Sequence, residues 1–115
     1  MIKSYIVYYS FRRDDIYHTH NLRIFESKDK AIEYQNLCNQ TLVEYQKIIT
    51  GRDKVYSRYN TYTELYNSND MSLYNQKLEE WSIRVHQQLS LPVPYTIPYE
   101  STGLYFGIEE VEKGD

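Results

Sequence analysis

Two histidines stand two positions apart in a stretch rich in β-forming residues. His18 and His20 flank Thr19, and because the side chains of a strand alternate between its faces, both imidazoles would lie on the same side. Three other side chains could supply the third ligand that a metal site needs: His86, Glu26 and Cys38. None of these spacings matches a zinc pattern, so the pair is interpreted as ordinary sheet histidines, and no metal or other cofactor is expected.

Cations and tyrosines alternate in a second segment of the chain. The candidate ligand-binding residues are Arg52, Lys54, Tyr56 and Arg58, with Tyr59 and Tyr62 following. Cations that hold phosphate beside rings that stack on bases suit a nucleotide or single-stranded nucleic acid. Residues 1–60 carry a net charge of +3, which agrees with this hypothesis. The net charge of −3 for the whole chain weakens attraction to a polyanion.

The second half of the chain is acidic, with a net charge of −6 over residues 61–115. Carboxylates beside tyrosines can meet a basic, nucleic-acid-binding groove, because complementary charge steers association. Tyrosine is also a frequent hot-spot residue of protein interfaces. The candidate partner-binding residues are Tyr59, Tyr62, Tyr66, Tyr95, Tyr99, Glu109, Glu110 and Glu112. The sequence thus favours a non-enzymatic protein that binds and inhibits a nucleic-acid enzyme, with the nucleotide hypothesis as the alternative.

The sequence contains few residues or motifs typical of enzyme active sites. The four glycines are scattered and form no phosphate-binding loop, and no nucleophile elbow is present. His86 has no orienting partner that the sequence can show. Cys38 falls on the apolar face of an expected helix, which indicates a buried structural thiol. We therefore expect no catalytic residues.

Composition sets the broader limits. The chain has 115 residues, of which 14 are Tyr and only 3 are Phe, so tyrosine must supply much of the core. The length suits a single domain over residues 1–115. No apolar run approaches the ~20 residues of a membrane span, and the N-terminus does not resemble a secretory signal. We expect a cytoplasmic protein without a membrane partner.

The elements that position these residues follow from local pattern. Residues 2–11 and 17–25 are typical of strands, joined by a turn at 12–15 in which two Asp favour reversal. Ser27 is a suitable N-cap. From Ala31 to Ile49, apolar residues recur every three or four positions, and Gly51 is placed where a C-terminal cap is wanted.

The rest of the chain is more varied. Residues 52–67 form a Tyr-rich insert that is either helical or an ordered loop. Residues 71–89 repeat the apolar stripe, with Trp81 on it. The three prolines make 91–99 an extended connector, and 103–111 is a closing strand. The fold class predicted is α+β: a small antiparallel sheet, made of an N-terminal hairpin and a C-terminal strand, with two long amphipathic helices on one face.

Such a sheet would leave one face and an edge free. Ile2, Ile6 and Tyr8 share one face of the first expected strand. Exposed strand edges and a thin core both favour self-association, so a homo-oligomer is compatible with either functional hypothesis.

The hairpin followed by Phe25-Glu26-Ser27-Lys28-Asp29-Lys30-Ala31-Ile32-Glu33-Tyr34, and then Asn39, resembles small accessory proteins of phages and prophages of low-GC bacteria. The resemblance covers about the first 45 residues and lies in the Lys-, Asn-, Ile- and Tyr-rich usage. It implies a host-directed protein of the anti-CRISPR or other anti-defence type, acting on a host protein in the bacterial cytoplasm. It supplies no site residues.

Overall fold

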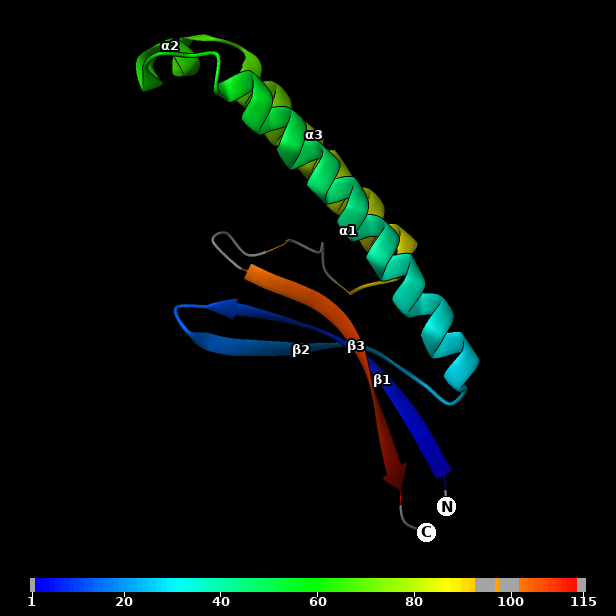
Figure 1. The fold of residues 1–115 in the computed structure, drawn as a ribbon. Coiled ribbons are helices and arrows are strands. Elements are labelled where there is room, and N and C mark those ends of the chain that lie inside the picture. The colour runs from blue at the N-terminus through cyan, green and yellow to red at the C-terminus, as the bar shows by residue number, and fades with distance from the viewer. Residues whose placement is uncertain (1, 93–96, 98–101, 114–115) are drawn as a thin grey trace. The chain divides into compact units, whose positions relative to one another are not determined.

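The computed structural model describes residues 2–92, 97 and 102–113. Its elements follow the order β1 (Ile2–Arg13), β2 (Ile16–Phe25), α1 (Lys28–Tyr56), α2 (Tyr62–Asn67), α3 (Asp70–Gln88) and β3 (Thr102–Lys113) (Figure 1). The α+β class predicted from the sequence is confirmed. Most of the expected connector 91–99 lies outside the described residues. None of the helices described is long and apolar enough to cross a membrane.

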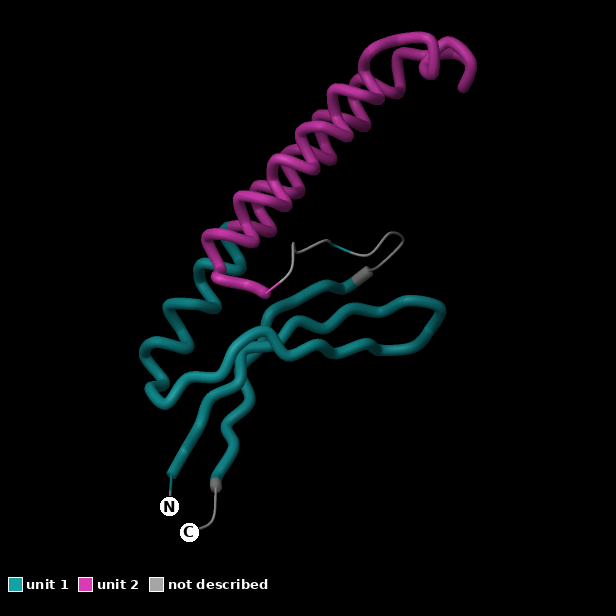
Figure 2. The backbone as a smooth tube through the Cα atoms, turned by 180° about the vertical axis from the view of Figure 1, so that it is seen from behind, with its two compact units in different colours: residues 1–40, 96–115 teal, residues 41–95 magenta. Residues whose placement is uncertain are grey.

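The chain divides into two compact units (Figure 2). Unit 1 comprises residues 1–40 and 96–115 and holds the sheet, and unit 2 comprises residues 41–95 and holds the helical hairpin. Helix α1 contributes its first part to unit 1 and its second part to unit 2. A single domain over 1–115 stays a prediction.

β1 is the central strand of a three-stranded antiparallel sheet with the order β2-β1-β3. Arg13 pairs with Ile16 across a two-residue turn in which Asp14 and Asp15 have φ angles of 54° and 62°. Two successive positive φ angles are the mark of a type I′ turn, whose twist matches that of the strands it joins. The expected hairpin and its turn are therefore present.

The two faces of the sheet differ in burial because side chains alternate along each strand. The inner face contains Val7 and Phe11 of β1, which are 0% and 5% exposed, and Phe106 of β3, which is 5% exposed. Five rings from the three strands contact one another on this face: Tyr9, Phe11, His18, His20 and Phe106. Of these rings, Phe11 and Phe106 are buried in the core of unit 1, whereas Tyr9 and His18 are half-buried and His20 is exposed.

The first part of α1 lies against the inner face. Ser27 Oγ accepts a hydrogen bond from the Lys30 amide, at 3.4 Å, and thereby caps the helix as the sequence predicts. The Tyr34 ring packs on Phe25, and Gln35 Nε2 donates to the backbone carbonyl of Phe106 at 2.8 Å. Residues spaced three and four apart are the buried ones: Ala31, Tyr34 and Cys38.

The prediction that Gly51 caps the C-terminus of this helix is wrong. α1 continues through Gly51 to Tyr56, because the residues that follow are compatible with a helix and Gly51 does not adopt the left-handed conformation of a cap. A Cβ at position 51 would stand 3.6 Å from the Tyr74 hydroxyl, an ordinary contact. The glycine instead lies where α3 comes close.

Unit 2 is a helical hairpin in which α3 runs beside the second part of α1 (Figures 1 and 2). Trp81 is 3% exposed, and its Nε1 donates to the Thr41 carbonyl at 3.1 Å. Arg84 pairs with Glu44 across the same seam at 2.6 Å. The expected core role of Trp81 is thus confirmed. The insert 52–67 proves to be the end of α1, a turn, and the short helix α2.

Candidate interaction surfaces

The predicted partner-binding residues fall in different parts of the chain. Tyr59, Tyr62 and Tyr66 belong to unit 2, whereas the three glutamates belong to β3 in unit 1. Tyr95 and Tyr99 lie outside the described residues. We describe the two surfaces separately, as the tyrosine tip (Tyr59, Tyr62, Tyr66) and the acidic strand (Glu109, Glu110, Glu112).

Local hydrogen bonds define the tyrosine tip. Thr61 is the N-cap of α2, and its Oγ1 accepts from the Glu64 amide at 3.1 Å. The Glu64 carboxylate in turn accepts from the Asn60 amide, also at 3.1 Å. This exchange satisfies amides that the first turn of a helix leaves free. The side chain of Leu65 is buried, so α2 is held by apolar packing as well as by its N-terminal hydrogen bonds.

Tyr62 and Tyr66 are the exposed residues of this tip. They are 70% and 67% exposed. Because they stand four positions apart, they share one side of α2, and their ring centroids lie 6.0 Å apart. The structure therefore brings these two predicted residues together as an outward-facing pair.

Tyr59 has a different environment. It is half-buried, and its hydroxyl donates to the Asp70 carboxylate in the first turn of α3. Its polar atom therefore has a partner within the chain, and the residue braces the turn between α1 and α2. Tyr59 therefore has a structural role next to the exposed pair Tyr62 and Tyr66, and it is itself less exposed.

The acidic strand is exposed, but its members do not share one face. The register pairs Glu109 with Ile6 and Glu110 with Tyr5, so the two side chains project to opposite faces of the sheet. Glu110 accepts from the Tyr5 hydroxyl at 3.4 Å and pairs with Lys3 at 3.3 Å. Such an exposed pair adds little stability, and its carboxylate remains accessible.

Glu109 lies on the same face as two tyrosines. Burial raises the pKa of Tyr8, with further contributions from Tyr105 and from the negative charge of Glu109. The Tyr8 and Tyr105 rings meet edge to face, with centroids 6.2 Å apart. Glu109 is thus the carboxylate of the acidic strand that borders an aromatic surface.

The residues of the alternative nucleotide site point in several directions. Arg52 pairs with Asp53 at 3.0 Å, and its guanidinium lies 5.7 Å from the Tyr56 ring centre. That ring contacts Tyr74 of α3, so this pair belongs to the seam between the helices. Arg58 is exposed in the turn after α1. The four predicted residues do not converge on one point.

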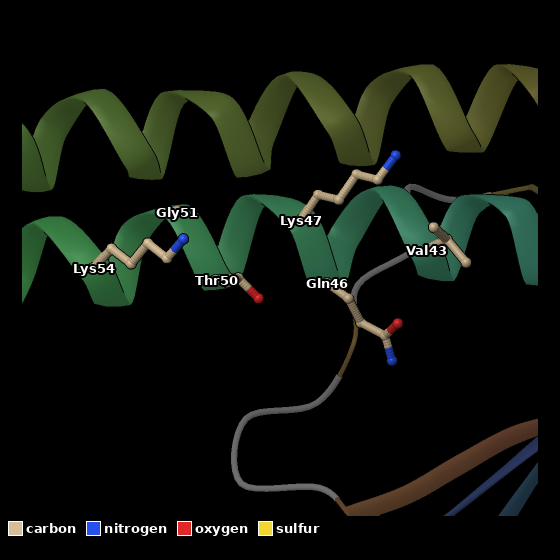
Figure 3. Close-up of a pocket in the computed structure, with 6 residues that line it drawn as sticks. All are labelled: Val43, Gln46, Lys47, Thr50, Gly51 and Lys54. Atoms are coloured by element: carbon tan, nitrogen blue, oxygen red, sulfur yellow. The ribbon is translucent and has the colours of Figure 1, made fainter.

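Lys54 shares a surface depression with another cation. It lines a shallow depression of about 370 Å³ on one side of α1, together with Val43, Gln46, Lys47, Thr50 and Gly51 (Figure 3). Lys47 and Lys54 are seven positions apart, which places them on the same side of the helix. Sequence reasoning missed Lys47, although this spacing could have indicated it.

The candidates for metal or thiol chemistry find structural roles. His18 and His20 do share a face, where they stack on Phe11 and Tyr9 at centroid distances of 5.1 and 5.0 Å. Within the described residues no group of three or more metal-ligating side chains occurs. Cys38 is fully buried, which confirms the expectation, and burial raises the pKa of its thiol to about 12.

Comparisons of the chain with protein-family models, with curated proteins and with solved structures found no match.

Proposed function

We propose that the chain is a non-enzymatic binding protein that docks on another protein through the tyrosine tip. The observation that carries the proposal is the exposed pair Tyr62 and Tyr66 on a helix that is capped and anchored in advance. Tyrosine offers a large contact area and loses little conformational entropy when it binds. A rigid presentation lowers the ordering cost of association further.

The proposed partner carries a basic surface, as a nucleic-acid enzyme does. Support comes from the acidic strand, in which Glu109, Glu110 and Glu112 are all exposed. Long-range attraction raises the rate of encounter without requiring that each carboxylate touch the partner. Occupation of a nucleic-acid groove would inhibit the enzyme, and a host defence enzyme is the target that the resemblance to phage accessory proteins implies.

The test is affinity capture of partners from lysate of a bacterial host, with and without nuclease. Three proteins are compared: the wild type, the double variant Tyr62→Ala/Tyr66→Ala, and a control, Leu73→Ala/Ile83→Ala. The control removes two side chains of unit 2 that are each 46% exposed. We expect a stoichiometric partner that survives nuclease, is lost with the tyrosine variant and is kept by the control. Equal capture by all three proteins would refute docking through the tip.

A second candidate function is the binding of a nucleotide or single-stranded nucleic acid. The observation that favours it is that Lys47 and Lys54 line one depression, which Thr50 lines as well. In the same experiment it predicts retention of nucleic acid or nucleotide without a protein partner. Retention should fall steeply with salt and be lost in Lys47→Ala/Lys54→Ala.

A further inference from the structure

The face of the sheet opposite the aromatic core carries large apolar side chains. Four of them are well exposed: Ile2 at 60%, Tyr17 at 71%, Ile24 at 64% and Tyr105 at 49%. The pairing register places them on one face with three half-buried residues, and together the seven form what we call the outer face: Ile2, Ile6, Tyr8, Tyr17, Ile24, Tyr105 and Val111.

The size of the outer face is what a dimer interface needs. Its four most exposed side chains present on the order of 500 Å² to solvent, with the exposed polar side chains Asn21 and Thr19 between Ile24 and Tyr17 on β2. With the partly exposed residues between them, the area approaches the ~800 Å² per partner of a standard interface. A monomer would leave this surface in water.

We propose that the outer face binds the outer face of a second copy of this chain, with a two-fold axis that lies between the sheets and runs across the strands. We call a residue of β1 together with its paired residues on β2 and β3 a row. An axis placed between Tyr8 and Ser10 reverses the order of these rows along β1. It superimposes the row of Ile6 on the row of Arg12 in the second copy.

The two superimposed rows are complementary on the β2 side. Ile24 pairs with Ile6, and Tyr17 pairs with Arg12. The axis keeps β2 opposite β2, so Ile24 of each copy meets Tyr17 of the other. An aliphatic side chain against an aromatic ring is a favourable contact between stacked sheets, which pack about 10 Å apart.

The charges of these rows are complementary as well. Glu109 stands beside Ile6 on β3, and Arg12 ends the other row on β1. The proposed axis brings Glu109 of one copy beside Arg12 of the other, which also pairs with Asp15 of its own chain, on a face that is otherwise uncharged over its centre. A second copy therefore matches both parts of the surface, with apolar side chains opposite apolar ones and Arg12 beside Glu109.

The experiment is sedimentation equilibrium over a hundredfold range of protein concentration. Wild type is compared with Ile24→Lys, which places a charge in the proposed contact between Ile24 of one copy and Tyr17 of the other. The control is Ile83→Lys, which alters an exposed side chain of α3. We expect a wild-type dimer, at least a tenfold rise in dissociation constant for Ile24→Lys, and no change for the control.

A charge exchange tests the orientation independently. Glu109→Arg and Arg12→Glu should each weaken the dimer severalfold, and the double variant should recover most of the loss. Both positions are exposed and the lost pair between Arg12 and Asp15 is an exposed one, so circular dichroism should show the native fold for all three variants. A wild type that stays monomeric throughout, a dimer that Ile24→Lys leaves intact, or a double variant no tighter than the single ones would overturn the proposal.

Discussion

The ring of Tyr8 lies directly over Gly107 on the neighbouring strand. A Cβ at position 107 would come within 2.4 Å of the ring's Cζ and 2.5 Å of its hydroxyl oxygen. The φ angle of Gly107 is not positive, so backbone conformation does not require glycine here. The close approach of the Tyr8 ring does. The ring covers backbone that a strand glycine would otherwise leave open to solvent.

This contact predicts that Gly107→Ala displaces the Tyr8 ring and breaks its contact with Tyr105. We expect a loss of about 1 kcal/mol, which is small because the ring can swing away without moving the backbone. In a Tyr8→Ala background the same change should stabilise the sheet by up to about 1 kcal/mol, because alanine is the better strand residue there. Urea denaturation of the four proteins measures the coupling, and simple additivity would contradict the contact.

The hairpin turn gives a prediction of the opposite sign. Asp14 and Asp15 both hold positive φ angles, which Asn and Gly adopt at lower cost. Asp14→Asn/Asp15→Gly should therefore raise the free energy of unfolding by about 1 kcal/mol. The lost ion pair between Asp15 and Arg12 subtracts little because both side chains are exposed. A lower midpoint in thermal denaturation would argue against this turn type.

Cys38 should be protected from thiol reagents. Burial raises the pKa of its thiol to about 12, and the side chain is fully inaccessible. At pH 8 the thiolate, which is the reactive form, is then almost absent. We expect alkylation by iodoacetamide to proceed only as the protein unfolds, and at the rate of a free cysteine in 6 M guanidinium. Rapid labelling of the folded protein would show that the helix face is open.

Tyr34 should make the free energy of unfolding fall as the pH rises into the alkaline range. Burial, which leaves the residue 6% exposed, raises its pKa to about 12. The unfolded chain releases this proton near pH 10 while the folded protein retains it. Stability is therefore fully present below pH 10 and falls as the pH rises towards 12, by up to about 3 kcal/mol from this group.

The variant Tyr34→Phe isolates that effect. It removes the titrating hydroxyl and keeps the ring that packs on Phe25. Between pH 10 and 12, chemical denaturation should show a shallower loss of stability for the variant than for wild type. Parallel curves for the two proteins would mean that Tyr34 ionises freely in the folded state.

The pattern of residue types along the sequence made most of the fold predictable. β-Branched and aromatic runs marked the strands, Ser27 marked the start of α1, and the stripe through Trp81 marked α3. The end of α1 was not predictable from Gly51, because glycine is tolerated inside a helix at a modest cost and the packing against α3 outweighs it. That packing is a tertiary fact without a local signal.

The candidate surfaces were harder to predict, because the sequence does not show which tyrosines are buried and which are exposed. Tyr74 is 8% exposed and Tyr62 is 70% exposed, although both follow helical spacing. An apolar ring with a polar tip suits either environment, so position along the chain does not separate them. Tyr59 illustrates the same limit, since its bond to Asp70 depends on how two helices meet.

The central strand also has a consequence for the order of folding. β1 and β2 are joined by a two-residue turn, whereas β1 and β3 meet through residues such as Tyr5 and Glu110 that are 105 positions apart. Local pairing closes a short loop and non-local pairing a long one, so the hairpin can form while the other edge of β1 is still bare. During synthesis that edge stays a template for foreign strands until the ribosome has released β3.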